Sequence, residues 1–352
     1  FNIDTAFENM KKCRLCQLVD PTQTGSHIVP HFLIRRYENP PGEKDRGYEM
    51  GFEIGGLFTK GYVGRSVSPE SIEPVYGEFT EEDRQNNKHP DIEDYYFCPR
   101  CEKRFQVIEN IYSTTLSCFD KTGRPKAIAS ELGILFWCSV FWRLGEQRLP
   151  AMHFTDQEME LMRSVLDECL PEPNQKPDMD IISNHEGLKQ LSYALIRCTS
   201  NEEDNKFFLV HPRYIKPHAL VVADQIVFLS VDGDYSQARA GDFFGIEENV
   251  KDISENKVGG TESYTTITPE VLHVLIEGAI ELAKQIRFTE VSEFLDEVYR
   301  EAGGPGNGWP DFIKQEIWQE LTANETKLGR RYTKEDLIRC SRKVFSRYIP
   351  QE

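Results

Sequence analysis

Two closely spaced pairs of cysteines constrain the fold of this 352-residue chain more than any other feature. Two residues separate the cysteines of each pair, a spacing that places two thiolates about one edge of a tetrahedron apart. Two such pairs complete a tetrahedral site of four thiolates. We therefore predict one structural zinc ion, Zn²⁺, bound by Cys13, Cys16, Cys98 and Cys101. The alternatives are four unrelated core cysteines or a redox-active C-x-x-C motif, which would leave the other pair unexplained.

The remaining cysteines carry no disulfide pattern. They are scattered along the chain, most of them within apolar helical patterns: Cys118, Cys138, Cys169, Cys198 and Cys340. Disulfide frameworks belong to short secreted chains, whereas lone cysteines behave as small core residues. No apolar run follows the basic residues of the N-terminal segment, so we expect no signal peptide and a cytoplasmic location. We also expect no membrane span, because the longest apolar run is only residues 134–142.

The charge of the chain is unevenly distributed. The formal net charge is −17, of which residues 1–150 contribute −3 (19 basic, 22 acidic) and residues 151–352 contribute −14 (22 basic, 36 acidic). A nucleic-acid surface is therefore not expected in the second half, because phosphate contacts favour Lys and Arg. We expect that half to engage a protein partner, if any. Basic residues near the first cysteine pair could form a local patch: Lys11, Lys12, Arg14, Arg35 and Arg36.

The order of sequence patterns predicts an α+β protein with three parts. Residues 1–125 form a zinc-bound module with an insertion at about 38–94, in which we expect a hairpin around residues 48–63. Residues 126–172 form a helical segment, and the Pro-rich linker 171–178 follows it. Residues 179–352 form an acidic α+β domain.

Local patterns place individual elements. Helices are expected after the second cysteine pair, at 126–143, after a Thr155/Glu158 capping box, at 188–197, after Thr268-Pro269, and at 334–348. Strands are expected in the runs YYF, FFLV and HALVVADQIVFLSV. Arg143, at the end of a Trp-rich helix, is a candidate partner for a core acid.

A histidine motif lies between the two cysteine pairs. It reads Ser26-His27-Ile28-Val29-Pro30. The order of C-x-x-C, an H-I-x-P strand, and an apolar strand leading into C-x-x-C and a helix resembles the zinc-containing HNH endonucleases, the ββα-metal or treble-clef group. The resemblance covers roughly residues 10–112, and SHIVPHFL with CPRCEKRFQVIE is similar to a set of bacterial HNH-like proteins.

The resemblance implies roles for particular residues. His27 would be the general base that activates water, beside a divalent metal, while the four cysteines bind the structural zinc. Three positions depart from the family pattern: Ser26 replaces an acid or histidine, Glu102 an asparagine, and Phe105 a lysine, histidine or asparagine.

Replacement metal ligands can be proposed for the divergent site. Glu102 and Glu109 lie seven residues apart, on one face of the expected helix, and His31 follows His27 by four residues. The carboxylates of the two glutamates suit Mg²⁺ or Mn²⁺. The alternative is structural: Glu102 as a first-turn acid favoured by the helix dipole, Glu109 as a solvated residue, and the histidines as members of the zinc fold.

These observations lead to two functional hypotheses. The first is a metal-dependent HNH-like nuclease that hydrolyses DNA or RNA, for which the resemblance suggests a role in bacterial defence. The second is a non-catalytic zinc-stabilised module that binds a protein or nucleic-acid partner. The H-I-x-P strand favours the first hypothesis, whereas Ser26 and Phe105 favour the second.

Overall fold

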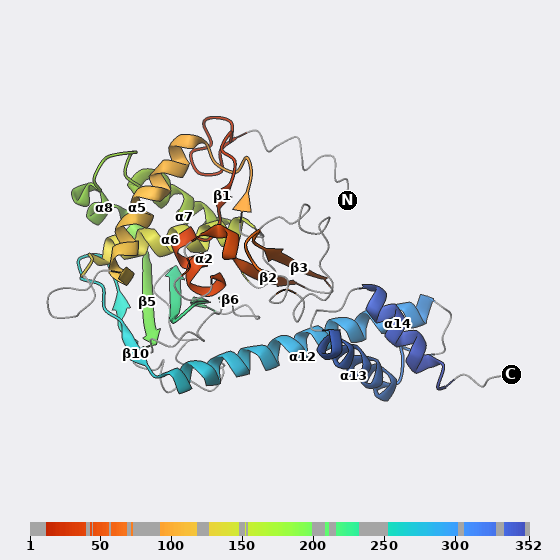
Figure 1. Cartoon of the computed structure of the whole chain (residues 1–352). Helices are drawn as coiled ribbons and strands as arrows, with labels where there is room; N and C mark the ends of the chain where they lie inside the picture. The colour runs from red at the N-terminus through yellow and green to blue at the C-terminus, as the bar shows by residue number, and fades with distance from the viewer. Residues whose placement is uncertain are drawn as a thin grey trace. The chain divides into compact units, whose positions relative to one another are not determined.

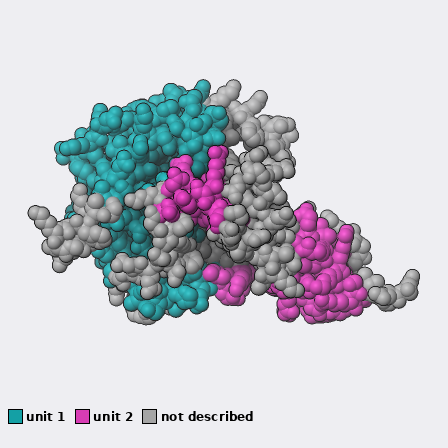
Figure 2. All heavy atoms as spheres, viewed as in Figure 1, with its two compact units in different colours: residues 1–37, 91–279 teal, residues 38–90, 280–352 magenta. Residues whose placement is uncertain are grey.

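The structure is a computed structural model of the whole chain (Figure 1). It describes residues 12–39, 43, 45–55, 58–68, 72, 92–117, 127–147, 152, 154–198, 208–210, 216–231, 253–301, 306–328 and 334–348. The chain divides into two compact units, residues 1–37 with 91–279 and residues 38–90 with 280–352, which Figure 2 colours separately. Helices and strands both occur, so the α+β class is confirmed. The linker 171–178 lies inside the first unit, and the predicted three-part division stays a prediction.

The first unit holds the cysteine pairs and a mixed sheet. Its helices are α2 (His31–Glu38, whose last residue belongs to the second unit), α5 (Pro99–Ser117), α6 (Ser130–Glu146), α7 (Asp156–Cys169), α8 (Met179–Asn184), α9 (Glu186–Lys189) and the start of α12 (Pro269–Glu301). Its strands are β1 (Ser26–His27), β4 (Ile92–Glu93), β5 (Leu191–Cys198), β6 (Phe208–Val210), β7 (His218–Val222), β8 (Gln225–Val231), β9 (Glu255–Asn256) and β10 (Thr265–Ile267).

The larger sheet separates two hydrophobic cores. Its strand order is β10-β5-β8-β7-β6, with β9 also paired to β5; β10 is parallel to β5 and the other pairs are antiparallel. Alternate side chains of β5 point to opposite faces. Tyr193 and Leu195 pack with helices α5, α6 and α7, whereas Ala194 and Ile196 pack with the first turns of α12. Both faces of the sheet are therefore covered by helices.

The sequence prediction for residues 188–197 was wrong. We expected a helix there, but a helix ends at Lys189 and β5 begins at Leu191. All eight residues of β5 are buried, so the strand shows no alternation of polar and apolar residues. Such an uninterrupted run has the same appearance as a buried helix. The run YYF was also expected as a strand, but the strand of this segment is the earlier β4.

Other local predictions are confirmed. Helices α5, α6, α12 and α14 (Lys334–Phe345) occur where expected, and so do strands β6, β7 and β8. The Thr155 side chain and the Glu158 carboxylate form a reciprocal capping box at the start of α7. The hairpin in the insertion is also present, as β2 (Met50–Gly55) paired antiparallel with β3 (Phe58–Val63).

A buried carboxylate fixes the segment between β9 and β10. Glu262 accepts hydrogen bonds from the hydroxyls of Tyr112 and Tyr193, at 2.9 and 2.6 Å, and pairs with Arg197 at 2.9 Å. Its side chain is only 5% exposed. Because Tyr112 belongs to α5 and Tyr193 and Arg197 belong to β5, this cluster anchors the helix that carries Cys101 to strand β5 of the sheet.

The second unit contains the hairpin, a short 3-10 helix at Arg46–Tyr48, the rest of α12, α13 (Asp311–Leu328) and α14. The three long helices share one core, in which Leu295, Ile317 and Leu337 are buried. Asp296 links two of the helices, because one carboxylate oxygen accepts from the Trp309 backbone N–H and the other pairs with Lys314 at 2.8 Å. Among the described residues, no helix is both long and apolar enough to cross a membrane.

Candidate metal centre and the adjacent histidine site

The four cysteines of the two C-x-x-C pairs come together in the first unit. Their sulfur atoms all lie within 4.8 Å of one another, and all four residues are buried. A tetrahedral Zn²⁺ with Zn–S bonds of about 2.3 Å separates its sulfurs by roughly 3.8 Å. The cysteines are free thiols and not disulfides. The group can therefore hold a metal ion, as the spacing predicted.

Backbone hydrogen bonds shape the loop that carries the first pair. The Gln17 N–H donates to the Cys13 carbonyl at 2.9 Å, and the Cys13 N–H donates to the Val19 carbonyl at 2.7 Å. Gln17 adopts a left-handed conformation, with φ of 55°, which reverses the chain directly after Cys16. This tight turn directs both thiols to the same side.

The second pair uses the start of a helix. Cys98 precedes α5 and Cys101 lies in its first turn, where the Glu102 N–H donates to the Cys98 carbonyl at 3.1 Å. Pro99 occupies the first helical position, which favours proline because no helical partner is needed for its missing N–H. The positive end of the helix dipole stabilises thiolates there.

The thiols perturb one another. A hydrogen bond from Cys101 lowers the pKa of Cys13 to about 5, whereas burial raises the pKa of Cys98. The pKa of Cys101 is raised because its thiol donates to the Cys13 thiolate. The protein alone thus favours one thiolate stabilised by a neighbouring thiol, and a bound cation would supply the charge that four thiolates require.

His27 lies on a short strand pair beside the cysteines. Strands β1 and β4 are antiparallel, with His27 opposite Ile92. A hydrogen bond next to this strand pair holds the two segments together: the Gly25 N–H donates to the Asp94 carboxylate at 2.7 Å. Gly25 has a φ of 68°, a left-handed conformation that suits glycine. The His27 ring is half-buried, and its centroid lies 5.4 Å from that of His31 at the start of α2. The structure thus brings together the two histidines of the motif.

Arg143 connects this strand to α5. Its side chain is only 2% exposed, and it donates to the His27 carbonyl at 2.8 Å and pairs with Glu109 at 2.8 Å. Its Nε donates to the Ser139 carbonyl, and its guanidinium lies 4.9 Å from the centre of the Phe105 ring. The core acid expected for Arg143 is therefore Glu109, which lies 34 positions earlier in the chain.

Glu102 and Glu109 occupy different environments on the same helix. The Glu109 carboxylate is neutralised by Arg143. Burial raises the pKa of Glu102, and the Arg143 charge and the neighbouring Ser26 hydroxyl partly offset this. The carboxyl group of Glu102 therefore lies close to the strand that carries His27, and Glu109 is held by an ion pair.

Two positions that depart from the HNH pattern are buried. Ser26 is fully buried, with its hydroxyl near Glu102. Phe105 is 1% exposed and packs against Phe97 with ring centroids 5.0 Å apart. The Phe105 ring also lies against Trp142 and the guanidinium of Arg143. Phe105 therefore serves the core and supports Arg143, and it offers no ligand.

Two of the basic residues near the first cysteine pair form ion pairs with acidic side chains. Arg36 pairs with Asp224 at 2.5 Å, and Arg14 lies 3.5 Å from Glu146. Apart from the four cysteines, no three side chains of His, Cys, Asp or Glu within the described ranges bring ligand atoms within 4.8 Å of one another. The proposed set of His31, Glu102 and Glu109 is therefore not a preformed metal cage in this structure.

Comparison with known proteins gives no match: no family model matches the chain, and neither a curated protein nor a solved structure is significantly similar to it.

Proposed function

We propose that the first unit is a zinc-stabilised, metal-dependent nuclease module of the HNH-like kind, which hydrolyses phosphodiester bonds of DNA or RNA. The observation that carries the proposal is the placement of His27. It lies on a strand that follows one cysteine pair, is half-buried, and stands beside the helix that begins at the other pair. The zinc is structural and is bound by Cys13, Cys16, Cys98 and Cys101, since four thiolates leave no open position.

His27 is assigned the role of general base, which takes the proton from the attacking water. Glu102 is assigned to a catalytic Mg²⁺ or Mn²⁺ ion. Mg²⁺ is usually bound through one or two carboxylates together with water and substrate phosphates, so a three-residue cage is not needed before the substrate arrives. Glu109 is assigned a positioning role, because its carboxylate pairs with the guanidinium that also binds the His27 carbonyl.

The non-catalytic alternative is favoured by a separate observation. Ser26 and Phe105 occupy positions at which a nuclease of this family would carry metal or phosphate ligands, and Ser26 is buried while Phe105 packs against Arg143. The Glu109 carboxylate is paired with the same arginine. In that case the module is a scaffold whose zinc stabilises a binding surface. The two functions predict opposite results in a cleavage assay.

The test is cleavage of supercoiled plasmid, linear duplex, single-stranded DNA and RNA by the purified full chain with Mg²⁺ or Mn²⁺. We expect metal-dependent cleavage that His27→Ala reduces by about 100-fold or more, the range typical of a general base. His273→Ala is the matched control, since His273 is 69% exposed on α12 and pairs only with Glu277 among the contacts described. Its activity should equal that of the parent chain.

Three results separate the hypotheses. Loss of cleavage in His27→Ala alone, with zinc content unchanged, supports the nuclease. Equal cleavage by the parent chain and His27→Ala contradicts the assignment of the base. A folded, zinc-loaded chain that cleaves none of the substrates contradicts the nuclease and favours the binding module.

A further inference from the structure

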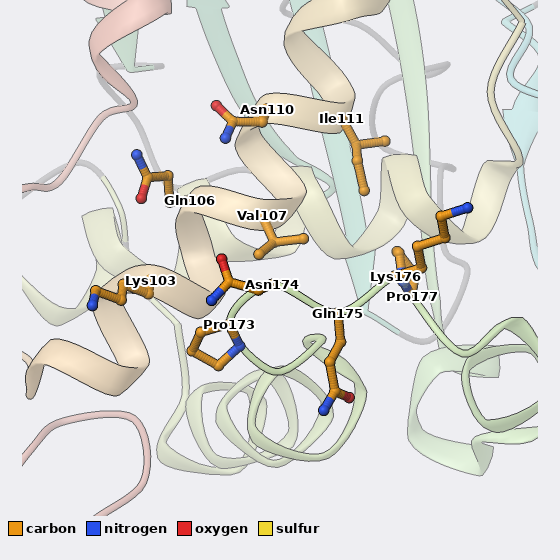
Figure 3. A pocket seen from close by; sticks show the side chains of 10 residues that line it. All are labelled: Lys103, Gln106, Val107, Asn110, Ile111, Pro173, Asn174, Gln175, Lys176 and Pro177. Atoms are coloured by element: carbon orange, nitrogen blue, oxygen red, sulfur yellow. The ribbon is translucent and has the colours of Figure 1, made fainter.

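A recess of about 470 Å³ lies in the first unit between α5 and the Pro-rich linker. Figure 3 shows the side chains that surround it, with Lys103 and Lys176 at opposite ends. The lining consists of two lysines, four carboxamides and four apolar residues: Lys103, Gln106, Val107, Asn110, Ile111, Pro173, Asn174, Gln175, Lys176 and Pro177. No acidic residue lines it, although the chain as a whole has a net charge of −17.

The two acids that flank the linker segment of the recess are already engaged. Glu172 precedes the linker residues of the recess, and its two carboxylate oxygens accept from Arg100 at 2.8 and 2.5 Å. Asp178 follows them and caps α8 by accepting from the backbone N–H groups of Asp180 and Ile181. The two lysines therefore line the ends of a site whose flanking linker carboxylates are paired or capped, and the local field favours an anion.

The chemistry of the lining selects among anions. Carboxamides of Asn and Gln provide both donors and acceptors, which match the edges of nucleobases. Val107, Ile111 and the two prolines offer aliphatic surface to the face of a base, and the lysines at the two ends suit the phosphates on either side of it. A paired duplex keeps its bases stacked inside, so a recess of this kind suits an unpaired nucleotide.

The recess lies on the helix that carries Glu102 and Glu109. Lys103, Gln106 and Asn110 follow one another at helical spacing, on a face turned by about 100° from that of the two glutamates. A polynucleotide strand bound along the recess would thus lie on the same helix as Glu102, to which the catalytic ion is assigned. A role for such a strand rests on the proposed nuclease function, but its binding can be measured without cleavage.

We propose that this recess is a binding subsite for a single-stranded polynucleotide, in which Lys103 and Lys176 contact phosphates and the carboxamides contact one base. The walls are aliphatic and not aromatic, so base stacking contributes little. Affinity therefore depends on charge and falls steeply with salt. Discrimination between sequences is expected to be small.

The test is fluorescence anisotropy of a fluorescein-labelled single-stranded oligonucleotide titrated with the full chain, without added Mg²⁺ or Mn²⁺. The variant Lys103→Ala with Lys176→Ala should weaken binding by about tenfold or more near 0.1 M salt and reduce the slope of log affinity against log salt by roughly 1.4. The matched control is Lys189→Ala with Lys257→Ala, which removes the same charge from exposed lysines that pair with Glu186 and Glu255. It should change affinity less than twofold.

Three outcomes contradict the subsite. The chain does not bind the single strand, the recess variant and the control lose equal affinity, or the same sequence binds more tightly as a duplex. Binding that depends on the pocket lysines supports the subsite even if no substrate is cleaved, in which case the nuclease proposal fails alone. If the chain cleaves its substrate and substitution of Lys103 and Lys176 changes neither cleavage nor binding, the nuclease proposal stands and the subsite fails.

Discussion

The cysteine cluster and the histidine site are neighbours in the first unit, but they are organised differently. The four thiols converge within 4.8 Å and are buried, so the metal site is complete within the chain. The histidine site is spread over β1, α2, α5 and α6. Arg143 joins the His27 carbonyl to Glu109, and the His31 ring lies beside that of His27. The first arrangement suits a metal that stabilises the fold. In the second, the His27 carbonyl and the Glu109 carboxylate are held by a hydrogen bond and an ion pair with Arg143.

The largest expected effect is the loss of the structural metal. Cys101→Ser should leave the purified chain with far less than one zinc per protein and a first unit that no longer unfolds cooperatively. The reason is that structural zinc supplies an apparent binding free energy of roughly 10–16 kcal/mol, as much as the whole stability of a typical domain. Metal analysis and thermal unfolding measure both changes.

Cys138→Ala is the control for that substitution. Cys138 is also fully buried, but it lies in α6 and outside the four-thiol group. We expect a loss on the order of 1 kcal/mol in the free energy of unfolding, with an unchanged zinc content. A full complement of zinc in Cys101→Ser would contradict the structural metal site.

The second effect concerns the arginine of the histidine site. Arg143→Met should lower the free energy of unfolding by about 3 kcal/mol, near the lower end of the range for a broken buried ion pair, because Glu109 retains 18% exposure. Urea unfolding measures the change.

Adding Glu109→Gln to Arg143→Met removes the unpaired carboxylate and should restore more than half of the loss in the free energy of unfolding. Simple additivity of the two single substitutions would contradict direct coupling between Arg143 and Glu109.

The comparison also shows how far sequence reasoning can reach. The cysteine cluster was predicted because the spacing within each pair is local and chemically specific. Arg143 was recognised as a candidate for pairing, but its partner lies 34 positions away, and only the packing of α5 against α6 identifies Glu109. Phe105 is another such case, because its contact with the guanidinium depends on both helices.

The same limit explains the error at residues 188–197. Strand β5 pairs with β8, β9 and β10, which come from later parts of the chain. The sheet that they form is covered by helices on both faces, so every side chain of β5 is buried and its sequence lacks the alternation by which a strand is recognised. The recess between α5 and the linker was missed because its lysines and carboxamides belong to two segments that sequence alone does not place together.

A third effect, comparable in size to the second, appears in acid and concerns a histidine outside the metal site. Burial lowers the pKa of His218 from 6.5 to about 4, and its ring packs against Phe154 with centroids 3.9 Å apart. The unfolded chain therefore binds a proton as the pH falls below 6.5, whereas the folded chain does not until about pH 4. Stability is fully present above pH 6.5 and falls by up to about 3 kcal/mol between these values.

His218→Leu should flatten that part of the pH dependence in urea unfolding. Acid also protonates the cysteine ligands and releases metal, so zinc release measured in His218→Leu reports the cysteine cluster alone. An unchanged slope between pH 6.5 and 4 in the variant would contradict the assignment of this acid sensitivity to His218.

The smallest effect is expected at a second arginine that also reaches α6. Arg14 lies beside the first cysteine pair, 3.5 Å from Glu146 and 5.5 Å from the centre of the Tyr96 ring, but its side chain is 39% exposed. Solvent screens such a pair, so Arg14→Ala should cost about 0.5 kcal/mol or less in urea unfolding and leave the zinc content unchanged. The contrast with Arg143 is one of burial and not of charge. A loss comparable to that of Arg143→Met would mean that ion pairs around the cysteine cluster, and not the metal alone, hold the α5–α6 layer in place.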